Sequence, residues 1–143
     1  MPLNETQTLH GWANKSFDGK LHPIVPVRLL DTRVGQIACI TPGAIITAAG
    51  TRTYQVVSGC TKIPGEAVAI VGGVLAVNNT ASGFIAIWPS NAARPLISQL
   101  NYNLTVAVTG RTFVTSLSPD GKISVYSSAD TDAVIDIYGY FIA

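Results

Sequence analysis

The stretch Val25–Arg33, V-P-V-R-L-L-D-T-R, is an apolar run that abruptly acquires two arginines and one aspartate. We expect this run to be the first strand of the fold. Its counterpart is the last apolar run, Ala133–Phe141, which also carries a single aspartate. Between these two runs we expect one β domain.

The charged side chains of the two runs are Arg28, Asp31, Arg33 and Asp136. An aspartate inside a strand invites a catalytic role, as one of a pair of carboxylates that act as acid and base. Burying a carboxylate without a cationic partner is very costly, however, and both arginines are close to Asp31 in the sequence. We therefore predict that Arg28 or Arg33 pairs with Asp31 or Asp136 and ties the first strand to the last. A hydrolase that uses Asp31 or Asp136 is the weaker alternative.

The composition favours an all-β domain that associates with other chains. A chain of 143 residues is long enough to bury a core of its own, and residues with a high strand propensity are plentiful. Only 12% of the residues are charged, whereas 48% are apolar. So little charge does not cover a monomer's surface in the usual way. We therefore expect a homo-oligomer or binding to a larger shell protein. A symmetric trimer on a virion is the favoured form of the oligomer.

From residue 24 onward, short apolar runs alternate with Gly, Pro, Asn and Asp, which is the pattern of successive strands. Their regular spacing indicates a single antiparallel β-sandwich or barrel, jelly-roll-like, over residues 23–143. Strands are predicted near 25–31, 44–48, 51–57, 67–78, 82–88, 96–102, 105–108, 111–117, 121–127 and 132–141. The turn Ser118–Gly121 predicts a hairpin between the strands on either side of it.

The last strand is expected to be apolar on both faces, because side chains alternate between the two faces of a sheet. The even-numbered face contains Val134, Asp136, Tyr138 and Tyr140. Such a strand is either covered on both sides or has one face against another chain.

Residues 1–22 are interpreted as an extended N-terminal arm, which is polar but holds Leu9, Trp12 and Phe17 at wide intervals. Two readings stay open: an arm that docks on a neighbouring subunit, and a disordered leader. The first twenty residues lack the pattern of a secretory signal. We expect the protein on a virion or at an extracellular surface.

Cys39 and Cys60 are the only two cysteines, and each is near a turn. The sequence leaves open whether they form a disulfide or stay as two reduced, buried thiols.

Few residues are suited to catalysis or to metal binding. His10 and His22 have no carboxylate at a ligand spacing, so we expect no metal, no cofactor and no enzyme activity. The nine basic residues are scattered, which disfavours nucleic-acid binding. Gly72 and Gly73 interrupt the longest apolar stretch, and we expect no membrane insertion.

Trp88, Tyr102 and Tyr126 are candidates for a glycan platform, because the faces of sugar rings stack on aromatic rings. The alternation of residues places most of the aromatic side chains where a core would need them, so a place in the core is the competing interpretation.

Five segments together resemble a β domain that is repeated in bacterial secreted and cell-surface proteins, often beside cell-wall hydrolases. They are Pro26–Arg33, Ala81–Pro89, Arg94–Tyr102, Asp120–Tyr126 and Val134–Phe141. The family pattern runs from PVRLLDTR through a GYLTVWP-like strand, RPxxSxLNY and DGxxxVY to a final DVxGYF strand. Where that family usually has an LNVT-like strand, this chain has Val71–Leu75.

The resemblance implies an accessory module without a catalytic role. A single small module with an arm suits a structural protein that assembles with itself or decorates a larger shell, such as a phage capsid decoration, a tail protein or a surface-layer protein. A carbohydrate-binding module for cell-wall or surface glycan is the alternative.

Overall fold

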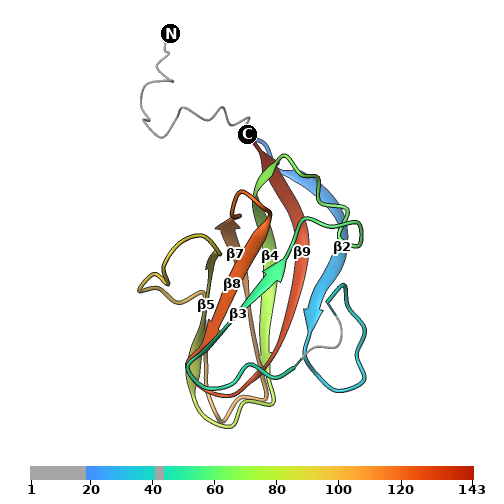
Figure 1. Cartoon of the computed structure of the whole chain (residues 1–143). Helices are drawn as coiled ribbons and strands as arrows, with labels where there is room; N and C mark the ends of the chain where they lie inside the picture. The colour runs from blue at the N-terminus through green and yellow to red at the C-terminus, as the bar shows by residue number, and fades with distance from the viewer. Residues whose placement is uncertain (1–18, 41–43) are drawn as a thin grey trace.

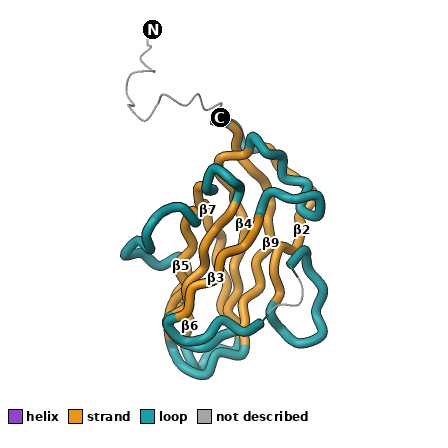
Figure 2. Tube along the Cα trace, viewed as in Figure 1, coloured by secondary structure: helices purple, strands orange, loops and turns teal. Residues whose placement is uncertain are grey.

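The structure is a computed structural model that describes residues 19–40 and 44–143, and every regular element in those residues is a strand. The strands are β2 (His22–Asp31), β3 (Gly50–Gln55), β4 (Ala67–Val77), β5 (Gly83–Pro89), β6 (Leu100–Tyr102), β7 (Val108–Ser116), β8 (Lys122–Ser127) and β9 (Asp132–Ile142). They form two four-stranded antiparallel sheets that face each other (Figures 1 and 2). Of the two architectures expected, the structure therefore shows the sandwich.

The strand pairing is that of one long hairpin rolled up on itself. β2 pairs with β9, β3 with β8, β4 with β7 and β5 with β6. Rolling adds the pairs β4–β9 and β5–β8, which produces the sheet orders β2-β9-β4-β7 and β3-β8-β5-β6. This is the topology of a jelly roll. The first and last described strands are therefore neighbours, as expected.

Each of β2 and β9 contains an irregularity that changes which side chains point inward. In β2, Arg28 lies opposite Asp136 and Leu30 lies opposite Ile135, so Leu29 is an extra residue. A bulge of this kind turns neighbouring side chains to the same face. Leu29 and Leu30 are accordingly both buried.

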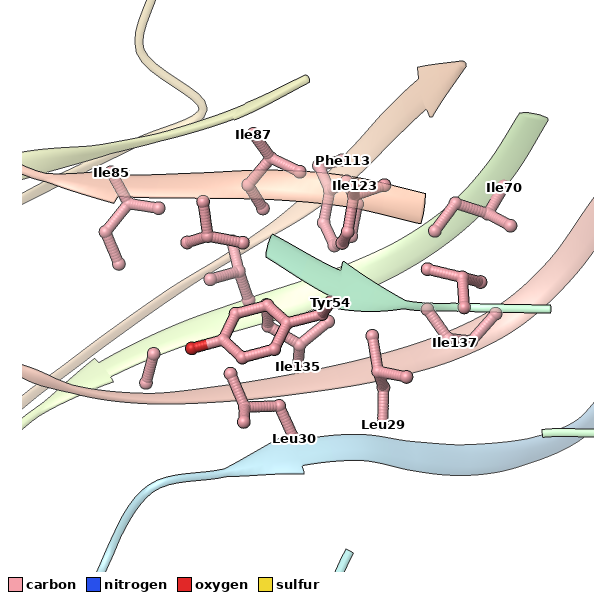
Figure 3. Packing of buried hydrophobic residues seen from close by; sticks show 14 of the residues in the cluster. Leu29, Leu30, Tyr54, Ile70, Ile85, Ile87, Phe113, Ile123, Ile135 and Ile137 are labelled. Carbon is pink, nitrogen blue, oxygen red and sulfur yellow. The ribbon is translucent and has the colours of Figure 1, made fainter. Parts of the chain in front are cut away.

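The core lies between the inner faces of the two sheets, and isoleucines supply much of its volume (Figure 3). Ile135 and Ile137 of β9 meet Ile123 of β8 and Ile85 and Ile87 of β5 there. β-Branched side chains suit this packing because they fill the surface of a pleated sheet well.

Some of the predicted strands differ from the observed ones. Residues 44–48 form no strand, because only Ile46 makes a backbone bridge, to Thr131. The run predicted at 96–102 is reduced to β6, and residues 105–107 precede β7 without forming a strand of their own.

The hairpin predicted at Ser118–Gly121 is a turn, but the strands beside it do not pair with each other. The amide of Gly121 donates to the carbonyl of Ser118 over 2.8 Å, and Gly121 has a φ of 79°. β7 nevertheless enters one sheet and β8 enters the other. The turn is therefore an arch between the two sheets.

The predicted alternation along the last strand is correct up to Tyr138 and then wrong. Val71 lies opposite Gly139 whereas Gly72 lies opposite Ile137, so Tyr138 is an extra residue in β9. Beyond this bulge the alternation reverses, and Tyr140 packs against the core instead of sharing a face with Tyr138.

Candidate functional site

The predicted ion pairs between the first and last strands are present. Arg28 donates two hydrogen bonds to Asp136, from Nε to Oδ1 over 2.8 Å and from Nη2 to Oδ2 over 3.1 Å. Its third nitrogen, Nη1, reaches Oδ2 of Asp31 at 3.3 Å. Arg33 also donates two hydrogen bonds to Asp31, from Nε to Oδ1 over 2.9 Å and from Nη2 to Oδ2 over 2.6 Å. Bidentate pairs of this kind are strong and fix the geometry of both partners.

The electrostatics of this cluster favour a structural role. The side chain of Asp31 is fully buried, and its hydrogen bonds from Arg33 hold the pKa of its carboxyl below the usual range. The hydrogen bond to Asp136 likewise raises the pKa of Arg28. A general acid needs the opposite, a carboxyl whose pKa is raised toward neutrality. Asp31 is thus held ionised as a partner of two arginines.

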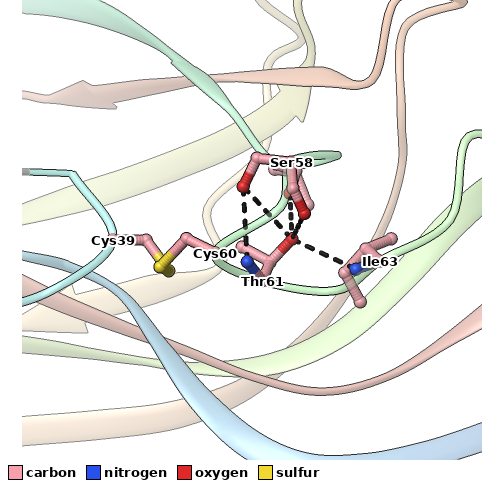
Figure 4. The surroundings of a disulfide bond; sticks show 6 residues. Cys39, Ser58, Cys60, Thr61 and Ile63 are labelled. Atoms are coloured by element: carbon pink, nitrogen blue, oxygen red, sulfur yellow. Dashed lines mark hydrogen bonds between the residues drawn. A yellow bond between two sulfur atoms is a disulfide. The ribbon is translucent and has the colours of Figure 1, made fainter.

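The two cysteines form a disulfide, which decides the alternative that the sequence left open (Figure 4). Their Cα atoms are 5.6 Å apart. The bond joins the segment after β2 to the loop after β3. In that loop the hydroxyl of Thr61 donates to the carbonyl of Val56 over 2.6 Å and accepts a hydrogen bond from the amide of Ile63. At the other end, the amide of Cys39 donates to the carbonyl of Arg28 in β2 over 3.0 Å, so both ends of the disulfide are anchored to the sandwich.

The three aromatic side chains of the expected glycan platform do not form one. Trp88 is only 5% exposed, and its indole N–H donates to the carbonyl of Ala92 over 2.9 Å. Tyr102 is 3% exposed and belongs to the core cluster between the sheets. Tyr126 lies under the guanidinium of Arg94, whose central carbon is 3.9 Å from the ring centroid.

The other expected residues are placed as follows. Leu9, Trp12, Phe17 and His10 lie outside the described residues. His22 stacks on Tyr140, with ring centroids 5.1 Å apart. Within residues 19–40 and 44–143, no three His, Cys, Asp or Glu side chains are grouped as a metal site would need. In this part of the chain, no helix has the length and hydropathy to span a bilayer.

An exposed apolar surface, which the sequence did not locate, covers the outside of the β2-β9-β4-β7 sheet. We call it the outer face. Val114 is 60% exposed, Val108 51% and Tyr138 41%. Register places further apolar side chains beside them: Val71 opposite Val114, Leu75 opposite Gly110, and Val77 opposite Val108. The sequence did contain a signal for this surface, because the last strand is apolar on both faces.

The middle of the outer face is hollow because two of its residues are glycines. The Tyr138 side chain lies over Gly73, and Leu75 lies over Gly110. Together with Arg111, Thr112 and Asp136 these residues line a shallow hollow of about 320 Å³.

Comparison with known proteins adds no family to these observations. No protein-family model matches the sequence, and no curated protein matches it.

Proposed function

We propose that this protein is a non-enzymatic structural module that assembles with further copies of itself through the outer face. The observation that carries the proposal is the exposure of Val108, Val114 and Tyr138 on a regular sheet whose opposite face already packs the core. Large apolar side chains gathered on one face mark an interaction surface more often than scattered ones do.

The size and charge of the outer face fit a second copy of the chain. Four strands about 4.8 Å apart, each with about nine residues rising about 3.4 Å, give a face of roughly 600 Å² in plan. A stable interface buries about 800 Å² of accessible surface on each partner, so the two are comparable. The net charge of the chain is only +1, and repulsion between copies is correspondingly weak.

The Arg–Asp cluster supports this proposal rather than a hydrolase. Its carboxylates are occupied by arginines from their own chain, which stabilises the joint between β2 and β9. The resemblance to an accessory β domain of cell-surface proteins agrees with a module that holds position instead of turning over a substrate. Decoration of a larger shell is the form that this assembly would take on a virion.

The test is sedimentation of the full chain and of Val114→Asp. We expect the wild type to form a dimer or larger species at micromolar concentration, and Val114→Asp to shift it toward the monomer. Leu96→Asp is the matched control, because Leu96 is 97% exposed but lies in the loop between β5 and β6. A wild type that stays monomeric at all concentrations, or an equal effect of both variants, would overturn the proposal.

A glycan-binding module is the second candidate, and the position of Tyr138 favours it. Its ring lies against Gly73, and the polar side chains of Thr112 and Asp136 line the same hollow. An exposed ring beside hydrogen-bonding groups is suited to stacking on a sugar. Binding to cell-wall oligosaccharides on a glycan array, lost in Tyr138→Ala and kept in Tyr126→Ala, would favour this candidate.

A further inference from the structure

The four edge strands of the sandwich differ in how well they are protected from pairing with another chain. β2 contains Pro23 and Pro26, which donate no backbone hydrogen bond. Part of its edge is also covered, because the amides of Cys39 and Ile40 donate to β2 carbonyls over 3.0 and 2.9 Å. β6 has only three residues, and short edges are another protection that natural sheets use.

β3, with six residues, also lacks proline and lysine, but the longer unprotected edge is β7. It has nine residues, Val108–Ser116, without proline or lysine. Among the described residues, β4 is the only strand hydrogen-bonded to it, over the full length of β7 (Figure 1). A long, regular and uncovered edge rich in Val and Thr is a ready template for another strand.

We propose that β7 pairs antiparallel with β7 of a second copy, about a two-fold axis at Thr112. The β2-β9-β4-β7 sheets of the two copies then join into a single eight-stranded sheet. This inference rests on the proposed self-assembly and adds to it a contact along the β7 edge, beside the outer face. A two-fold contact is self-complementary, since the same residues serve on both sides. It forms dimers, whereas a trimer was the favoured expectation.

The register follows from strand length and charge. Centring the pair on Thr112 is the one choice that pairs all nine residues, because residues 108 and 116 are equally far from residue 112. Thr112 then lies opposite itself, and Thr109 lies opposite Thr115; such threonine pairs stabilise sheets. Arg111 lies opposite Phe113. A register centred one residue earlier would set Arg111 opposite Arg111, which like charge disfavours.

The same register covers apolar side chains at the β7 edge of the outer face. Val114 of one copy lies beside Gly110 of the other, which has no side chain of its own. Leu75 already leans over Gly110, since its Cδ2 is 2.4 Å from where a Cβ would stand. The Val114 side chain of the second copy therefore contacts Leu75 of the first. The two-fold axis produces the same contact between Val114 of the first copy and Leu75 of the second.

Cysteine cross-linking tests the pairing and its register. The two natural cysteines are bonded to each other, so a new cysteine is the single free thiol of the chain. Residues directly opposite each other in antiparallel strands have Cα atoms about 4.5–5.5 Å apart, within the range that a disulfide spans. We expect Thr112→Cys to form a covalent dimer under mild oxidation, with most of the protein converted.

Two further variants on the same strand fix the register. Val108→Cys and Ser116→Cys alone have no thiol opposite and should cross-link at least tenfold more slowly. The double variant Val108→Cys/Ser116→Cys should cross-link through two symmetric bonds. It also tests the pairing independently of Thr112→Cys, should that variant fold poorly.

The outcomes separate this inference from the proposed function. If the chain sediments as an oligomer but Thr112→Cys cross-links no faster than Ser116→Cys, the β7 pairing is overturned and self-assembly stands. If the chain sediments as a monomer at every concentration, self-assembly is overturned and the pairing with it. Rapid cross-linking of Thr112→Cys and of the double variant, with slow single controls, supports both.

Discussion

Asp31 shows how a buried charge is kept at little cost in this fold. Its carboxylate is removed from water, yet Arg33 and Arg28 both donate to it while keeping part of their own surface exposed. The arginines therefore remain partly hydrated, and only the carboxylate is fully desolvated. A buried carboxylate arranged in this way depends on both cations for its stability.

Acid should weaken the protein through Asp31. The pKa of this carboxyl is lower in the folded chain than in the unfolded chain, so the folded state binds fewer protons between the two values. Its stabilising contribution is complete above the unfolded pKa of about 3.9 and is lost as the pH falls through the folded pKa. We expect the melting temperature, measured by circular dichroism from pH 6 downward, to fall across this window.

The variant Asp31→Asn should lower the free energy of unfolding at neutral pH by about 2 kcal/mol, the value of charged hydrogen bonds. The melting temperature of this variant should also fall less steeply with decreasing pH than that of the wild type. Glu66→Gln is the control, since Glu66 is exposed, and it should leave both nearly unchanged. An acid profile of Asp31→Asn as steep as that of the wild type would contradict this account.

At the scale of single elements, the backbone of β9 lies close to Gly72 of β4. A Cβ on Gly72 would stand 2.2 Å from the backbone oxygen of Asp136, which cannot move without shifting the strand. A Cβ on Gly73 would instead meet the hydroxyl of Tyr138, the far end of a side chain. The two neighbouring glycines therefore differ in what they tolerate.

We expect Gly72→Ala to lower the free energy of unfolding by about 3 kcal/mol, because overpacking against the backbone forces strand β9 to shift. Gly73→Ala should cost less than about 1 kcal/mol, since the Tyr138 ring can rotate away. Urea unfolding of the two variants measures both values. Equal losses would contradict the distinction between a backbone neighbour at Gly72 and a side-chain neighbour at Gly73.

The disulfide acts on the loops rather than on the sheets. Cys39 and Cys60 are separated by 21 positions, and closing a loop of this length stabilises a fold by about 3 kcal/mol in the chain-entropy model. The variant Cys39→Ser/Cys60→Ser should be less stable by that order in urea unfolding. Its circular dichroism spectrum should stay that of a β protein, because β2 and β9 remain joined by Arg28 and Asp136.

At the scale of the whole molecule, the rolled hairpin makes folding depend on distant contacts. Arg28 and Asp136, which join the first and last strands, are 108 residues apart. The entropy of closing this long loop is lost before the contacts between the strands can stabilise the fold. β9 lies between β2 and β4, so the sheet is incomplete until the end of the chain is in place.

We therefore expect refolding of the oxidised protein to take milliseconds to seconds, the range of sandwiches with mainly non-local contacts. Stopped-flow tryptophan fluorescence measures it, and double-jump experiments separate slower phases caused by proline isomerisation. Complete refolding within microseconds would mean that local contacts dominate after all.

Much of the fold could be predicted from local pattern, and the errors have identifiable causes. Apolar runs between turn residues located most strands, and the aspartates inside strands predicted the ion pairs. The pattern did not reveal the extra residues Leu29 and Tyr138, because a bulge arises from the register between two strands. Trp88 was predicted as a binding residue because its burial depends on Ala92 and the loop beyond β5, which the local sequence pattern does not place.

By itself, the sequence determined that the chain is a β protein, that its first and last strands carry complementary charges, and that it has unusually few charges elsewhere. These are local properties of side-chain type and spacing. Only the tertiary structure decided which sheet each strand joins, whether the cysteines meet, and which apolar residues stay outside. Those outcomes depend on contacts between residues far apart in the chain, and they leave β7 and the outer face available to a partner.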